Sequence, residues 1–96
     1  MAAYLIAEVD VQDPEGYEAY RKAVPATIAQ YGGRYLARGG RTEVLEGDHV
    51  PKRMVIVEFP SFEQARDWWA SQEYLEPKLI RQRTAISDLI LIDGLS

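Results

Sequence analysis

The sequence has no cysteine and a single histidine among its 96 residues. Without cysteine, a disulfide scaffold, a thiolate metal site and a cysteine nucleophile are all excluded. Glycine-rich phosphate loops, the serine-hydrolase elbow and the zinc-protease signature are also missing. Nucleotide hydrolysis, thiol chemistry and zinc-dependent hydrolysis are therefore poorly supported, and the motifs predict no metal and no cofactor.

Positive charge is also scarce, with 11 lysines and arginines against 15 acidic residues and a formal net charge of -4. The densest basic stretch, Arg34, Arg38 and Arg41, is interrupted by glycines and followed by glutamates. A nucleic-acid interface needs clustered cations, so no nucleic-acid partner is predicted. No apolar run approaches the roughly 18 residues of a membrane helix, and the first residues lack a basic signal region. These features predict a cytoplasmic protein without a membrane partner.

The segments that are present are short apolar or amphipathic runs, typical of one small domain over residues 1–96. The apolar run over 4–9 predicts a strand. Asp13 predicts the start of a helix, which Pro25 is expected to kink or break. The other predicted features are a helix end at Gly32-Gly33, an extended arm over 34–46 bent at Gly39-Gly40, a turn over 47–51, a strand over 54–59, helical segments capped by Ser61 and Ser71, and a strand over 88–93.

This order of elements predicts an α+β fold of the ferredoxin-like βαββαβ type. Right-handed crossovers place both helical segments on one face of an antiparallel sheet. The two central strands, however, are apolar on both of their sides. Since helices cover only one face, the other face is expected to meet the sheet of an identical subunit, which predicts a homodimer.

A combination of short motifs extends over nearly the whole chain. They are the Tyr-Leu-Ile-Ala-Glu opening, Tyr20 to Pro25, Gly32 to Leu36, Leu45 to Asp48, Glu58 to Phe62, Ser71 to Tyr74 and Arg81. Together these motifs resemble the domain of unknown function 1330 family, within the dimeric α+β barrel group. The resemblance implies two ferredoxin-like protomers that pack sheet to sheet. Related barrels include small monooxygenases without cofactors, isomerases, dechlorinating enzymes and haem-degrading enzymes, and also proteins with no known activity.

Two residues are candidates for proton transfer. His49 is the only side chain whose ordinary pKa lies near neutrality, so it is a natural general base. The family often has tryptophan or another bulky residue at this point, and an exposed turn histidine is the alternative interpretation. Glu58 lies in an apolar strand, where burial would favour an acid or base role; the alternative is a strand-end carboxylate that meets water or a cation. Glu8 is a similar strand carboxylate, but the antiparallel pairing predicts that it lies at the opposite end of the sheet.

Four further residues are candidates for ligand binding. Tyr20, Trp69 and Tyr74 could line an apolar cavity between helices and sheet, with phenolic hydroxyls that orient the ligand. Arg81 could bind an anionic group at the mouth of that cavity. The alternatives are plain core packing for the aromatic residues and a salt bridge or helix C-terminal cation for the arginine. Because Trp68 and Trp69 are adjacent on a helix, one is expected to face the core and the other the rim or the dimer interface.

Two functions remain open from the sequence. The first is a cofactor-independent enzyme, similar to a monooxygenase or an isomerase, that acts on a small organic compound between sheet and helices. The second is a dimer that binds a small ligand or serves an accessory role without catalysis. The state of the cavity separates them: an open cavity with an arginine and a titratable group favours the enzyme, and a filled one favours the second function.

Overall fold

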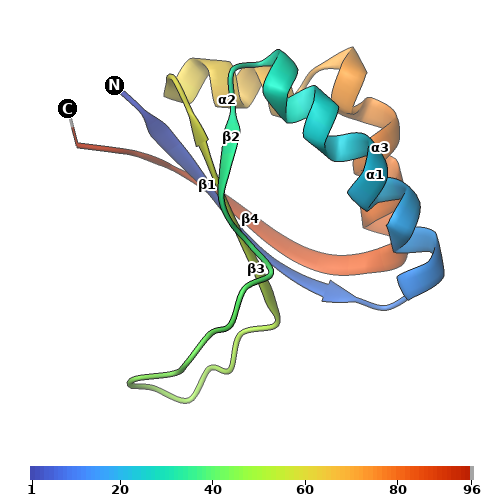
Figure 1. The fold of residues 1–96 in the computed structure, drawn as a ribbon, viewed down its shortest axis with the longest axis vertical. Coiled ribbons are helices and arrows are strands. Elements are labelled where there is room, and N and C mark those ends of the chain that lie inside the picture. The colour runs from blue at the N-terminus through green and yellow to red at the C-terminus, as the bar shows by residue number, and fades with distance from the viewer. Residues whose placement is uncertain (96) are drawn as a thin grey trace.

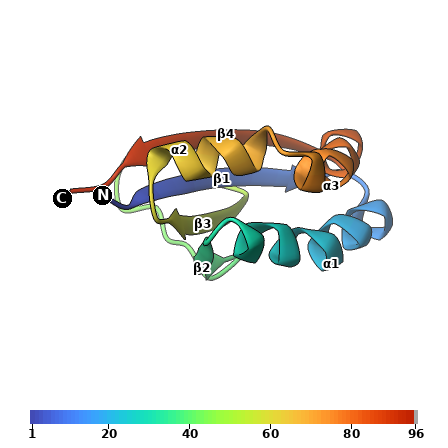
Figure 2. The same cartoon turned by 90° about the horizontal axis from the view of Figure 1, so that it is seen from above.

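A four-stranded antiparallel sheet forms one layer of the structure, a computed structural model that describes residues 1–95. Its strands are β1 (Ala3–Val11), β2 (Arg34–Arg38), β3 (Arg53–Phe59) and β4 (Ala85–Asp93), in the spatial order β2-β3-β1-β4. The helices α1 (Pro14–Gln30), α2 (Phe62–Trp69) and α3 (Gln72–Thr84) lie together on one face of this sheet (Figures 1 and 2). The element order confirms the predicted ferredoxin-like α+β fold, with the second helical segment divided into α2 and α3.

The strands separate the residues of the sheet into an inner face, toward the helices, and an outer face. Along β1, Ala3, Leu5, Ala7 and Val9 are buried, whereas the residues between them are more exposed. The pairing aligns Leu5 with Val57 of β3 and with Leu91 of β4, so the same alternation extends across the sheet. The outer face carries no helix within the described residues (Figure 1).

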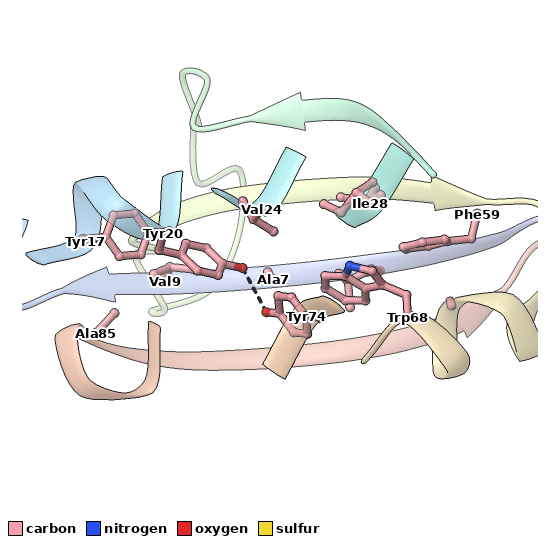
Figure 3. Close-up of a cluster of buried hydrophobic side chains, with 13 residues drawn as sticks. Ala7, Val9, Tyr17, Tyr20, Val24, Ile28, Phe59, Trp68, Tyr74 and Ala85 are labelled. Atoms are coloured by element: carbon pink, nitrogen blue, oxygen red, sulfur yellow. Dashed lines mark hydrogen bonds between the residues drawn. The ribbon is translucent and has the colours of Figure 1, made fainter. Parts of the chain in front are cut away.

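The core lies between the inner face and the helices (Figure 3). Trp68 of α2 is its centre: its ring centroid lies 4.0 Å from that of Tyr74 and 5.5 Å from that of Phe59. The indole nitrogen of Trp68 donates a hydrogen bond to the Thr27 hydroxyl at 3.0 Å, so the polar end of this buried ring is also satisfied. Large aromatic rings therefore fill most of the space under the helices.

Each helix begins at a side-chain cap that the sequence predicts. Asp13 accepts a hydrogen bond from the Gly16 amide, and Ser61 and Ser71 accept from the amides three residues further on. These caps satisfy amides that have no partner in the first turn of a helix. The side chain of Gln64 donates to the carbonyl of Tyr31 instead of closing a reciprocal capping box. Within residues 1–95, no helix combines the length and the apolar character needed to cross a membrane.

The expected break at Pro25 is wrong, because α1 runs without interruption from Pro14 to Gln30. Proline has no amide hydrogen, so the carbonyl four residues earlier, that of Arg21, loses its helical partner. Arg38 of β2 donates a hydrogen bond from Nη2 to this carbonyl at 2.9 Å. A tertiary contact thus replaces the missing helical bond.

The predicted extended arm over 34–46 is also corrected, since its strand ends at Arg38. Gly39 adopts a positive φ of 69°, and its amide makes the last bond to β3, with the carbonyl of Met54. Residues 40–52 then form an exposed loop, which we call the projecting loop, that extends away from the sheet (Figure 1). The last strand is longer than predicted, because α3 passes directly into β4 at Ala85.

Candidate functional site

A chain of polar contacts connects two helices inside the core. The hydroxyls of Tyr20, on α1, and Tyr74, on α3, lie 3.0 Å apart (Figure 3). Arg81 lies two helical turns after Tyr74 and donates from Nε to the same Tyr74 hydroxyl at 3.2 Å. Three of the four residues predicted to bind a ligand are therefore joined in one hydrogen-bonded group.

The charge of Arg81 has no counter-ion in the described part of the chain. Arg81 is only 6% exposed. The ion pairs within residues 1–95 are Arg21–Glu18, Arg34–Glu58 and His49–Glu8, and none of them includes Arg81. Buried guanidinium groups are normally paired, because removing the charge from water is costly. Arg81 is therefore a buried cation whose charge no carboxylate of residues 1–95 neutralises.

Burial keeps the phenols of the interior protonated. Desolvation raises the pKa of Tyr20 strongly, and the neighbouring Tyr74 raises it further, whereas Arg81 opposes the shift. Burial likewise raises the pKa of Tyr17, against the opposing charge of Arg53. These tyrosines act as hydrogen-bond donors and acceptors at neutral pH, and they are poorly suited to the role of a base.

A small cavity of about 30 Å³ remains between α1 and the inner face. Tyr17, Tyr20 and Tyr35 line it together with three arginines, Arg21, Arg38 and Arg53, and an apolar remainder. No aspartate, glutamate or histidine belongs to this lining. The volume suffices for about two water molecules. The interior is thus nearly filled, but its residual space is lined with positive charge.

A larger groove of about 510 Å³ lies beside it, between α2 and the last strand. Its walls are mainly apolar, with Leu89, Leu91 and the two tryptophans. Glu63, Arg66 and Asp67 add charged groups from α2. Volume alone would favour this groove, but it contains none of the tyrosine and arginine contacts described above. We therefore place the candidate site in the interior.

The two tryptophans divide between core and rim as the sequence predicts. Trp68 is 2% exposed and stacks on Tyr74, whereas Trp69 is 46% exposed. The ammonium group of Lys78 lies 3.9 Å from the centre of the Trp69 ring. Trp69 is predicted to line the interior cavity, but it instead lines the larger groove between α2 and β4. Trp68 lies beside Tyr20 and Tyr74 in its place.

The structure places both predicted proton-transfer residues away from this site. His49 is on the projecting loop, and its side chain is 74% exposed. Its Nε2 lies 2.7 Å from Oε1 of Glu8 on the outer face. Glu58, also on the outer face, accepts a hydrogen bond from Nε of Arg34 at 2.7 Å, which lowers the pKa of its carboxyl. Because the sheet separates both residues from Tyr20 and Arg81, the expectation that they move a proton in the interior is corrected.

Arg53 lines the cavity and is a candidate residue that the sequence does not single out. Arg53 shares the inner face with Val55 and Val57, so strict strand alternation from Val57 could have identified it. Arg38 has two interpretations from the sequence, a carboxylate-binding residue and a solvated strand residue, and its contacts with Arg21 and with the Tyr35 ring depend on tertiary packing. Within residues 1–95, no group of three or more metal-binding side chains is placed to hold a metal.

The family model of the domain of unknown function 1330 (DUF1330) matches residues 2–95. The chain belongs to the DUF1330 family. No protein of curated function matches it. Among solved structures, this DUF1330 protein is similar to the RPA0582 protein of unknown function from Rhodopseudomonas palustris, with 23% identity, a TM-score of 0.78 and coverage of 99% of this chain and 83% of that one.

Two further structures share the fold at lower identity. A dimeric protein of unknown function and ferredoxin-like fold from Bacteroides fragilis has 13% identity and a TM-score of 0.68, with coverage of 97% of this chain and 96% of that one. SnoaB, a cofactor-independent oxygenase from Streptomyces nogalater, has 12% identity and a TM-score of 0.67, with coverage of 99% and 94%. At these identities the likeness concerns the fold alone.

Proposed function

We propose that this DUF1330 protein binds a small organic acid, or the enolate of a small carbonyl compound, between α1, α3 and the sheet. The observation that carries the proposal is the buried guanidinium of Arg81, which has no carboxylate partner among residues 1–95. An anionic ligand would supply the missing counter-charge, and charge-assisted hydrogen bonds are the strong ones in an interior.

The tyrosines give this anion site its orientation. Nε of Arg81 donates to the Tyr74 hydroxyl, which leaves the Tyr74 proton free to donate to Tyr20. In that arrangement the Tyr20 hydroxyl, which also lines the cavity, can donate its own proton to a ligand. One guanidinium and two phenols would then favour an oxygen that bears negative charge over a neutral one.

The enzymatic form of the proposal is a cofactor-independent reaction of the monooxygenase or isomerase type. Both reaction types can begin with an enolate, whose negative oxygen the Arg81–Tyr74–Tyr20 group would stabilise. The shared fold with SnoaB, itself described as a cofactor-independent oxygenase, is consistent with this form. The cavity lining offers no carboxylate or imidazole as a base, so an acidic substrate would have to give its proton to water.

That missing base also favours a second candidate function, a dimer that binds a small ligand without catalysis. The nearly filled interior agrees best with an accessory role of the dimer, because such a role needs no space for a substrate. Both candidates share the anion site, and they differ in whether the bound compound changes.

The test compares Tyr74→Phe with Tyr31→Phe as the control, because the Tyr31 hydroxyl donates to Glu73 and lies outside the Arg81–Tyr74–Tyr20 group. Binding of a panel of two- to nine-carbon carboxylic and 2-keto acids, and of the matching amides, is measured by NMR. We expect acids but not amides to bind, and Tyr74→Phe to weaken them about tenfold, because it removes the hydroxyl that accepts from Arg81 and directs the Tyr20 proton toward the ligand. Unchanged binding by Tyr74→Phe would refute the site. Mass spectrometry of the same mixtures in air, without added cofactor, shows whether a bound acid is converted to a product. Conversion indicates an enzyme, and an unchanged acid indicates binding without catalysis.

We further propose that two copies pair through their outer faces, as the sequence predicts. The outer face of β4 exposes Ile86, Ile90 and Ile92, which is unusual for an unpartnered sheet. The Bacteroides fragilis protein of the same fold is described as dimeric, which supports a second copy as the partner. A cytoplasmic location and the lack of a nucleic-acid or membrane partner are part of the same proposal.

A further inference from the structure

Two polar atoms on the inner face lack hydrogen-bond partners within residues 1–95. They are Nε of Arg53, on β3, and Oγ of Ser87, on β4, and both are buried. The strand pairing aligns Val9 of β1 with both residues, so all three form one row across the sheet. An unpartnered buried donor such as the Arg53 N–H is rare in folded proteins and often marks a place for a bound group.

The surroundings of Arg53 are positively charged. Arg21 and Arg38 line the same cavity, and no carboxylate lines it. Arg21 is paired with Glu18 outside the cavity, but Arg38 and Arg53 form no ion pair in the described chain. Arg38 is held in place by its bond to the Arg21 carbonyl and by the Tyr35 ring, whose centre lies 4.6 Å from its guanidinium carbon. Arg38, which is exposed, and Arg53, which is half-buried, thus both line the cavity without an ion-pair partner in the described chain.

The backbone is shaped to accommodate the Arg53 side chain. Gly39 passes directly over its guanidinium group, and a side chain at position 39 would collide with Nη1 of Arg53. The positive φ of Gly39 allows this close approach. The loop that begins there therefore covers the guanidinium from one side, and the cavity lies among the residues of α1 and the sheet.

We propose that this cavity is the binding site for the carboxylate head of the ligand, with Arg53 as its principal donor and Arg38 as a second cation. The inference rests on the proposed function and narrows it. The ligand would carry a carboxylate at Arg53 and a second oxygen, such as a keto, enolate or hydroxyl oxygen, at the Tyr20–Tyr74–Arg81 group.

The size of the cavity and the geometry of arginine support a carboxylate as the head group. Room for about two water molecules corresponds to the two oxygens of a carboxylate. The planar guanidinium offers Nε–H and an Nη–H side by side, which matches a carboxylate edge. A tetrahedral phosphate, with four oxygens, would require the surrounding tyrosines to move.

The test uses acetate as the probe and records arginine Nε–Hε signals of the full chain by NMR. We expect acetate to shift the Arg53 signal in a saturable way, whereas acetamide, its neutral analogue, leaves the signal in place. Arg53→Lys, which keeps the charge but removes the donor fork, should weaken acetate binding at least tenfold. Arg34→Lys is the control, because Arg34 lies on the outer face beside Glu58. The wild-type signal needs no variant and remains informative if Arg53→Lys does not fold.

The inference is overturned if the Arg53 signal shows no saturable shift, if acetamide shifts it equally, or if phosphate binds there more tightly than acetate. Its failure is distinguishable from failure of the proposed function. Acids whose binding depends on Tyr74 but not on Arg53 would refute the head-group site alone. Acetate that binds at Arg53, with no effect of Tyr74→Phe on any acid, would refute the Arg81–Tyr74–Tyr20 site alone.

Discussion

At the scale of single residues, Tyr20 shows how burial and hydrogen bonding combine in this interior. Its ring packs at 5.3 Å from that of Tyr17, and its hydroxyl reaches Tyr74 across the space between α1 and α3. The hydroxyl cannot ionise without placing a negative charge in a buried setting, which raises its pKa. Ionisation of Tyr20 and the folded state are therefore coupled.

This coupling predicts a loss of stability at alkaline pH. The folded state holds the Tyr20 proton more tightly than the unfolded chain, whose tyrosines ionise near pH 10. The stabilising contribution is therefore fully present below about pH 10 and is lost as the pH rises further. Tyr20→Phe should reduce the slope of unfolding free energy against pH by about 1.4 kcal/mol per pH unit. Urea unfolding between neutral and alkaline pH measures this slope.

Tyr4→Phe provides the control, since Tyr4 lies on the outer face opposite Glu58 in the strand pairing. An equal change in slope for both variants would contradict the assignment of the effect to the buried phenol. An unchanged slope for Tyr20→Phe would show that Tyr20 ionises alike in the folded and unfolded chains.

At the scale of elements, α2 illustrates how two adjacent residues of one type take opposite roles. Consecutive positions on a helix point about 100° apart, so only one of the two tryptophans can enter the core. Trp68 does so, between Phe59 and Tyr74, while Trp69 packs against Lys78 at the surface.

The two tryptophans should therefore differ sharply in their contribution to stability. Trp68→Ala leaves a cavity among aromatic rings and removes the hydrogen bond that the indole donates to the Thr27 hydroxyl, so we expect a loss of about 3–5 kcal/mol. Trp69→Ala removes a half-exposed ring and one cation–π contact, for about 1 kcal/mol or less. Chemical denaturation measures both, and similar losses for the two variants would contradict the division between core and rim.

The elements also show which features can be predicted from the sequence. The helix caps at Asp13, Ser61 and Ser71 and the alternation along the strands depend on neighbouring residues, and the structure contains them as predicted. Features set by distant residues were not predicted. Helix α1 continues through Pro25, and Arg38, which is distant in sequence, binds the carbonyl that the proline leaves free.

The candidate site follows the same division. Tyr20, Tyr74 and Arg81 were predicted from helical spacing and residue type, and they do meet in the interior. His49 contacts Glu8 across 41 positions of sequence, on a face that the spacing of motifs does not specify. Arg53 was overlooked because a cation next to an apolar strand is usually solvated; only the packing of α1 and Gly39 encloses it.

At the scale of the whole molecule, a single copy covers one face of its sheet and leaves the other face exposed to water. The inner face is buried under three helices, whereas the outer face combines exposed isoleucines with the Arg34–Glu58 and His49–Glu8 ion pairs. Exposed apolar side chains beside charged groups on one face are typical of a surface that joins protein subunits. A second copy would remove the isoleucines from water.

Ile90→Lys tests this pairing directly. Ile90 is 62% exposed and lies midway along β4 on the outer face, next to Ile6 of the central strand β1. A lysine there would have to lose its hydration on association, so we expect the dimer to dissociate while the fold of each copy is kept. Leu79→Lys is the control, because this exposed leucine lies on α3, on the helical side of the molecule. Analytical ultracentrifugation at micromolar concentration should show a dimer for the wild type and the control, and a monomer for Ile90→Lys. A monomeric wild type would contradict the pairing, and the apolar outer face would then require a different protein as its partner.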